Sequence, residues 1–221
     1  MSEQNIHPNK YSELRSMFAH QIDLYIALHQ LKTENEEDLN KIYNTIKTEL
    51  IDSRNIVLKK IMKDILYIIL YNNRYKKSYL RLAKLLSDDY HITDVGFLTL
   101  TSNYLFYKEY GIKLDKSDDF EKLKLENLDI HSKDTIYRAI MYNDLERFIS
   151  FTEIEGFNKN QTLESKLYPN IGKLSLLELC CYHGAVDCFK FLRTKFNSKI
   201  TQKCLYLSFL GGNQEIISEC L

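Results

Sequence analysis

The cysteines and histidines are the residues most able to do chemistry in this chain. Five cysteines gather in its last fifth, around His183: Cys180, Cys181, Cys188, Cys204 and Cys220. Zinc sites usually contain a Cys-x₂-Cys or His-x₃-His pair, because that spacing lets two ligands converge on one ion. Neither pair occurs, and Cys180 and Cys181 are adjacent, so they point apart on a helix. We therefore interpret the cysteines as small buried core residues, and their odd number predicts reduced thiols.

The histidines and glycines show no pattern typical of an enzyme. The six histidines are scattered, at His7, His20, His29, His91, His131 and His183. No Ser/His/Asp or Cys/His spacing suggests a triad, although triads assemble in space rather than in sequence. No P-loop and no G-x-G-x-x-G motif is present. We expect a non-enzyme with no catalytic residue, cofactor or metal; titratable groups converging in a deep pocket would revive the enzyme hypothesis.

A basic stretch at residues 59–84 is the other chemical candidate. Its cations are Lys59, Lys60, Lys63, Arg74, Lys76, Lys77, Arg81 and Lys84, and Tyr71, Tyr75 and Tyr79 lie between them. Cations with interleaved aromatic rings can bind phosphates and stack bases. The whole chain has 30 Lys+Arg against 30 Asp+Glu, which argues against a general nucleic-acid binder. Nucleic-acid or anionic-surface binding through this stretch is the alternative function; a solvated helix face is the interpretation we prefer.

The elements that position these residues are predicted to be helices. The chain of 221 residues contains only seven glycines and two prolines. So few turn residues argue against an all-β fold. Apolar residues three and four apart predict helices over 11–31, 39–50, from near 52 to 70, over 79–86 and over 97–110. Thr33 or Asn35 suits a helix N-cap and Gly111 a C-cap. We predict an all-α fold with a helical bundle, a loop at 87–91 and a connection at 112–133.

Targeting signals are not visible in the sequence. The longest strongly apolar run, residues 65–71, is shorter than the roughly 20 residues that cross a bilayer. The N-terminus is polar and lacks the apolar region of a secretory signal. Together with the reduced cysteines, this predicts a cytoplasmic protein (or a nuclear one) without a membrane partner.

An internal repeat occurs near the C-terminus, in segments 136–148, 177–189 and 205–217. Each segment has a large aliphatic residue, a small residue three positions later, a turn residue, an acid and a large apolar residue. The turn residues are Asn143, Gly184 and Gly212. This pattern predicts pairs of short antiparallel helices, and each pair must stack on the next to bury its apolar face.

Residues 175–184, SLLELCCYHG, resemble the ankyrin signature Thr-Pro-Leu-His-x-Ala-Ala-x-x-Gly. The matching positions are Ser175, Leu177, Cys180, Cys181 and Gly184. Leu176 and Glu178 replace the proline and the histidine, which puts the usual Thr–His hydrogen bond in doubt. The second repeat step is shorter than the family's step of about 33 residues, and the first is longer, which implies an insertion within 157–173.

The whole chain is similar to divergent ankyrin-repeat proteins of parasitic protists, which carry a helical N-terminal segment and a repeat block known as DUF3447. The stretches that carry this likeness are HPNKYSELRSMF, LYNNRYKKSYLRLAKL, SNYLFYKEYGIKLDKS and SLLELCCYHGAVDCFKFLRTKFNSKITQKCLYLSFLGGNQEIISECL. The resemblance implies an N-terminal helical domain with its linker at 1–130 and an ankyrin-like solenoid at 131–221. The third repeat is incomplete, so we expect a truncated relative or further repeats beyond Leu221 in a longer parent chain.

The resemblance also implies a function, because ankyrin arrays bind protein partners along the exposed positions of their first helices. Carried over, these positions form what we call the first-helix row: Arg138, Met141, Tyr142, Leu179, Tyr182, His183, Leu207 and Leu210. Aromatic and flexible apolar side chains supply most of the energy of protein interfaces. We therefore expect a non-catalytic scaffold that binds an unknown protein through this row, unless the N-terminal bundle or further repeats cover it.

Overall fold

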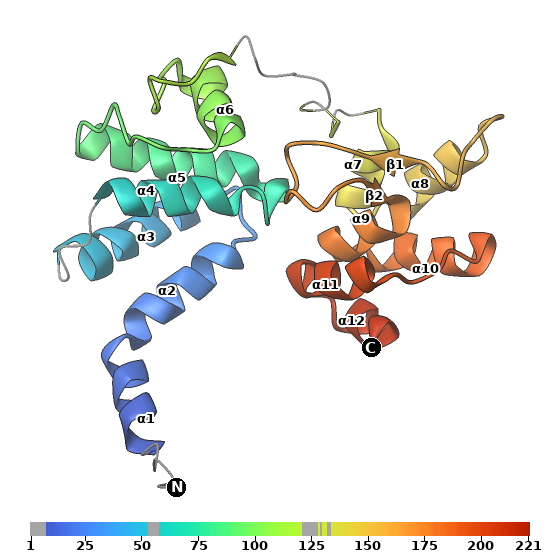
Figure 1. Ribbon diagram of the computed structural model, residues 1–221, viewed down its shortest axis with the longest axis horizontal. Coiled ribbons are helices and arrows are strands. Elements are labelled where there is room, and N and C mark those ends of the chain that lie inside the picture. Colours follow the sequence, from blue (N-terminus) through green and yellow to red (C-terminus); the bar gives the residue numbers. More distant parts are fainter. Residues whose placement is uncertain (1–7, 53–57, 121–127, 129, 132–133) are drawn as a thin grey trace, which may run out of the picture. The chain divides into compact units, whose positions relative to one another are not determined.

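The computed structural model describes residues 8–52, 58–120, 128, 130–131 and 134–221. It is mostly helical, which confirms the all-α prediction at that level (Figure 1). The chain divides into two compact units. The first contains Met1–Ile69 and Tyr75–Asp118, and the second contains Leu70–Arg74 and Asp119–Leu221. The short segment 70–74 thus belongs to the second unit, although the chain on either side of it belongs to the first.

The first unit begins with α1 (Pro8–Met17) and α2 (Ala19–His29). The sequence predicted one helix over this region, which is wrong. The backbone leaves helical geometry at Phe18, where φ is −109° and ψ is 10°. The three-and-four spacing of apolar residues continues across this break, so the spacing did not reveal it.

The next helix, α3 (Glu36–Ile46), begins at the predicted cap. The Asn35 side chain accepts hydrogen bonds from the backbone N–H groups of Glu37 and Asp38, at 2.8 and 3.3 Å. The helix continues into a π-helical segment, η1 (Lys47–Asp52). The predicted start of the following helix near Asp52–Ser53 lies at the edge of residues 53–57, which are outside the described residues.

The centre of the first unit is formed by α4 (Leu58–Ile68), α5 (Lys76–Asp89) and α6 (Leu100–Tyr110). The short 3₁₀-helix η2 (Asn73–Tyr75) precedes α5. The predicted loop at 87–91 is wrong over its first part, because α5 continues to Asp89. The helix predicted from Phe97 begins later, after an N-cap at Thr99. Gly111 ends α6 in the left-handed region, as predicted, with φ 71°.

The core of the first unit lies where α5 packs against α3, α4 and α6. Ile65 and Leu66 of the apolar run are fully buried there together with Tyr79, whereas Tyr67 remains about half exposed. The Tyr79 hydroxyl donates to the carbonyl of Leu28 over 2.8 Å, which ties α5 to the end of α2. The run 65–71 is therefore mainly core.

Three pairs of helices form the second unit over its described residues 134–221. They are α7 (Ile136–Met141) with α8 (Leu145–Thr152), α9 (Leu176–His183) with α10 (Val186–Phe196), and α11 (Gln202–Gly211) with α12 (Gln214–Cys220). The first helices pack on one another in the order α7, α9, α11, and the second helices pack in the order α8, α10, α12. Between α8 and α9, β1 (Thr162–Leu163) pairs antiparallel with β2 (Leu174–Ser175), with Thr162 opposite Ser175 and Leu163 opposite Leu174.

The turns within the three pairs share one backbone geometry. Asn143, Gly184 and Gly212 have φ of 54°, 65° and 63°, so each lies in the left-handed region. Asn143 is the only one of the three with a side chain, and its amide oxygen accepts from the backbone N–H of Asp187 and Cys188 at 3.0 and 3.3 Å. The turn of the first pair therefore caps the second helix of the next pair, α10.

The starts of α9 and α11 are joined by a buried carboxylate. Ser175 and Glu178 form a reciprocal capping box, in which the Glu178 side chain accepts from the Ser175 backbone N–H at 2.8 Å. The other Glu178 oxygen accepts from the Thr201 hydroxyl at 2.8 Å. Glu178 thus supplies a hydrogen bond between neighbouring repeat starts where the ankyrin signature has histidine.

Candidate functional site

The first-helix row lies on α7, α9 and α11 and the turn after α7, and most of it is buried. Tyr142 is the most exposed side chain of the row, at 49%. Arg138 and Leu210 are partly exposed, whereas Met141, Leu179, Tyr182, His183 and Leu207 are buried. The expectation that these side chains are exposed is therefore wrong for five of the eight positions. At the ends of α7 and α9 the row residues are buried because segment 70–74 packs on them within the second unit.

Arg74 makes the most unusual contact of this segment. Its guanidinium donates hydrogen bonds to the backbone carbonyls of Met141 and His183, the latter at 3.2 Å. These carbonyls end α7 and α9, where helix C-termini carry partial negative charge. The guanidinium also lies 5.7 Å from the centre of the Tyr142 ring, whose other cationic neighbour is Arg138 at 4.6 Å. One arginine side chain therefore hydrogen-bonds to the C-terminal carbonyls of two successive first helices, α7 and α9.

Tyr182 and Asn73 hold the rest of the segment. The Tyr182 hydroxyl donates to the carbonyl of Leu70 over 2.9 Å and accepts from the backbone N–H of Asn73 at 3.4 Å. The Asn73 side-chain amide donates to the carbonyl of Leu167 over 2.9 Å. The segment is thus bound through both its backbone and its side chains.

A buried aromatic cluster lies beneath these contacts. The Tyr168 hydroxyl is 2.8 Å from Nε2 of His131 and 2.9 Å from Nε2 of His183, and all three residues are buried. A hydroxyl has one proton, so with neutral imidazoles it donates to one histidine and accepts from the other. The two histidines must therefore carry their protons on different nitrogens. The ring of Tyr182 packs 4.8 Å from the rings of Tyr168 and His183.

Burial determines how this cluster titrates. It holds the pKa of His183 well below its usual value, and the nearby His131 and Arg74 lower that pKa further. Burial also raises the pKa of Tyr168 well above its usual value. Both groups are therefore neutral near pH 7. The Tyr168 hydroxyl is thus uncharged where it links the two imidazoles through hydrogen bonds.

The cysteines lie in the helices of the same unit, and all five are free thiols. Four are buried, and Cys220 is intermediate. Burial raises the pKa of Cys180 well above its usual value and that of Cys188 to about 12, so these two thiols are protonated at neutral pH and weakly reactive. Across the part of the chain that the structure describes, no group of three or more His, Cys, Asp or Glu side chains is placed to hold a metal ion.

The basic stretch is partly neutralised by neighbouring acids. Lys60 pairs with Asp64 at 2.6 Å, Arg81 pairs with Glu36 at 3.1 Å, and Lys84 pairs with Asp88. Arg74 is engaged by the helix carbonyls described above. Ion pairs and carbonyl contacts reduce the positive potential that a phosphate would meet, so these contacts favour the solvated-face interpretation over the alternative function.

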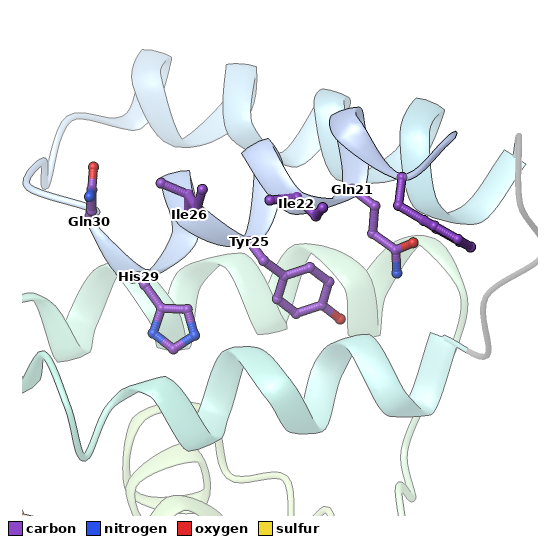
Figure 2. A pocket seen from close by; sticks show the side chains of 7 residues that line it. Gln21, Ile22, Tyr25, Ile26, His29 and Gln30 are labelled. Atoms are coloured by element: carbon purple, nitrogen blue, oxygen red, sulfur yellow. The ribbon is translucent and has the colours of Figure 1, made fainter. Parts of the chain in front are cut away.

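A shallow hollow of about 770 Å³ lies along α2 in the first unit. Figure 2 shows Ile22, Tyr25, Ile26 and His29 along it. The Tyr25 hydroxyl donates to Asp64 over 2.7 Å, and burial together with that carboxylate raises the pKa of Tyr25. Ile26 is 46% exposed. The hollow is thus a mostly apolar surface along one helix, with Gln21, His29 and Gln30 at its polar positions and the Tyr25 hydroxyl held by Asp64.

Sequence reasoning missed several residues of the site. Leu70, Asn73, Leu167 and Tyr168 were not singled out, Arg74 was counted only within the basic stretch, and His131 only among the scattered histidines. Their partners lie far along the chain, 109 positions away for Arg74 and His183. Side chains that bind backbone carbonyls produce no residue pattern, so the sequence contained no signal for this contact beyond the stretch LYNNRYKKSYLRLAKL.

The comparisons with known proteins concern the end of the chain. Within the described residues, no helix combines the length and apolarity needed to cross a membrane. No curated protein and no solved structure matches the chain. Residues 196–221, which include α11 and α12, match a family model described as a domain of unknown function, DUF3447.

Proposed function

We propose that the second unit is a non-catalytic protein-interaction module, an ankyrin-like solenoid whose first-helix row binds a segment of a partner protein. The domain organisation that goes with this proposal is an N-terminal helical domain followed by the repeats. The match to the DUF3447 model over α11 and α12 supports the resemblance on which the proposal rests.

One observation carries the proposal: the row is already engaged with a short chain segment. Residues 70–74 are held by two helix-end carbonyls, the Tyr182 hydroxyl and the Leu167 carbonyl. The Met141, Tyr182 and His183 groups are on helices that stack on one another, so little order has to be created there when a chain binds them. The second supporting feature is Tyr142, a half-exposed aromatic side chain next to the bound segment.

The test is affinity capture with the full chain and two single variants of matched chemistry. Tyr142→Ala removes the exposed ring of the row, and Tyr206→Ala removes a ring of similar exposure, 53%, on α11 but outside the row. Truncating an aromatic anchor at an interface costs about 1–3 kcal/mol, so affinity for the partner should fall about fivefold or more for Tyr142→Ala.

The control should recover the same partner as the wild type. Equal recovery by both variants, or a loss confined to Tyr206→Ala, would remove the row as the binding surface. Circular dichroism of each variant separates lost binding from lost folding, because both tyrosines are about half exposed and neither is core.

A further inference from the structure

Segment 70–74, Leu-Tyr-Asn-Asn-Arg, is recognised in the second unit through contacts that depend on residue type. Arg74 donates to two carbonyls at once, those of Met141 and His183, while its guanidinium faces the Tyr142 ring. A guanidinium is planar, has five donors and stacks on aromatic rings. A lysine ammonium at this position is a point charge on a flexible stem, so it would lose the stacking and the fixed fork.

Asn73 is a second position at which the contacts depend on residue type. Its side-chain amide donates to the Leu167 carbonyl, and its backbone N–H donates to the Tyr182 hydroxyl. Asn73 is fully buried, and an aspartate there would place a carboxylate against the Leu167 carbonyl with no proton to donate. The site therefore distinguishes an Asn-Arg pair from its closest substitutes.

The Tyr182 hydroxyl selects for the backbone turn that precedes this Asn-Arg pair. This single hydroxyl bonds to Leu70 at one end of the segment and to Asn73 near the other. In this geometry a turn over residues 69–71 is followed by the 3₁₀-helix η2. A ligand must therefore offer Asn-Arg at the start of a helical turn, three and four residues after the carbonyl that Tyr182 binds.

We propose that the first-helix row is a recognition site for a protein segment presenting Asn-Arg in such a turn, and that residues 70–74 occupy it in cis. This inference rests on the proposed function and names both its ligand and its regulation. A tethered ligand has an effective concentration in the millimolar range. The apparent dissociation constant for a segment in trans is therefore the intrinsic one divided by the fraction of molecules in which the site is open, and binding in trans is weakened. The wild-type chain is consequently closed to all but a tight or abundant partner.

The experiment uses a fluorescein-labelled peptide with the sequence of residues 69–77, ILYNNRYKK, and full-length chains titrated against it. The opened chain is Asn73→Ala/Arg74→Ala, which removes the side-chain contacts of the cis segment but none of the row. The matched control is Lys77→Ala, an exposed cation close to the segment that makes none of these contacts. Fluorescence anisotropy should show at least tenfold tighter binding to the opened chain than to the wild type or to Lys77→Ala.

Two altered peptides test the chemistry. Peptides with alanine or lysine in place of arginine should each bind the opened chain at least fivefold more weakly than the parent. If the double variant does not fold, as judged by circular dichroism, Arg74→Lys is used as the opened chain. Equal binding of the three peptides, or equal binding to wild-type and opened chains, would overturn the inference.

The outcomes separate this inference from the proposed function. A peptide that fails to bind any opened chain, alongside partner capture that still depends on Tyr142, leaves the interaction module standing and removes the Asn-Arg ligand. The Tyr182→Phe change, made in the opened chain, removes only the hydroxyl that bonds to both ends of the segment. Unchanged affinity for the peptide in that variant would also refute the Asn-Arg inference.

Discussion

Gly184 and Gly211 bring the backbones of α9 and α11 into direct contact, which makes the repeat stack testable by single methyl groups. A Cβ at Gly184 would lie 2.7 Å from the carbonyl oxygen of Gly211, and a Cβ at Gly211 would lie 2.1 Å from the carbonyl oxygen of Cys181. Real Cβ atoms do not approach backbone oxygen so closely, so the helices must move apart to accept either methyl group.

The three neighbouring glycines separate packing from backbone strain. Gly212→Ala adds strain alone, because φ is +63° and nothing lies within 4 Å of the added Cβ; it should cost about 1–2 kcal/mol. Gly211→Ala adds a clash alone at the end of a helix, and should cost about 1–3 kcal/mol. Gly184→Ala adds both, with φ +65°, and should cost about 2–5 kcal/mol.

The sign of the Gly211 effect is the critical result. Replacing a helical glycine by alanine normally stabilises by up to about 1 kcal/mol, so a destabilised Gly211→Ala chain can only reflect the contact with α9. Urea unfolding followed by circular dichroism at 222 nm gives the free energies. Hydrogen exchange of peptides from 176–183 and 202–211 assigns the loss to the second unit, because a chain of two units need not unfold in one transition. A stabilised Gly211→Ala chain would refute the close approach.

Three further predictions concern single groups. Asn143→Ala should lose about 2 kcal/mol, because it removes the cap of α10 and strains a residue at φ 54°, whereas Asn143→Gly should lose only about 1 kcal/mol; equal losses in urea titrations would contradict the strain component. The free energy of unfolding should fall below about pH 6.5, by up to about 1.4 kcal/mol per pH unit, because the unfolded chain protonates His183 while the fold keeps its pKa low. His183→Gln should flatten that slope, and a slope unchanged in His183→Gln rules out this origin. Asn35→Ala should cost about 1 kcal/mol by uncapping α3, and no measurable change would show that the cap is not needed.

The helices could largely be predicted because burial of one face leaves a periodic pattern. Leu39, Tyr43 and Ile46 of α3 are buried at three-and-four spacing, and the cap at Asn35 and the end at Gly111 follow from local backbone chemistry. The break at Phe18 was missed because helix interruptions do not alter that spacing. Positive φ at Asn143, Gly184 and Gly212 lies where the repeat alignment placed turn residues.

The site was predictable only as a set of positions. The row residues were located on the first helices by analogy with a family, and analogy does not say what covers them. At the ends of α7 and α9 the row is covered by Arg74, whose side chain donates to the backbone carbonyls of Met141 and His183. A carbonyl is present at every residue, so no residue type identifies it as an acceptor.

The passage of the chain through the second unit at 70–74, and back to the first, has a consequence during synthesis. Arg74 precedes His183 by 109 residues, and translation at about 5–20 residues per second separates their appearance by about 5–20 s. The acceptor carbonyls are synthesised in sequence, Met141 67 positions after Arg74, Leu167 94 positions after Asn73 and His183 last. The helices of the first unit can therefore form before Arg74 has both of its acceptors. The second unit can therefore be completed only after His183 has been synthesised, and a chain that begins at residue 119 would lack segment 70–74.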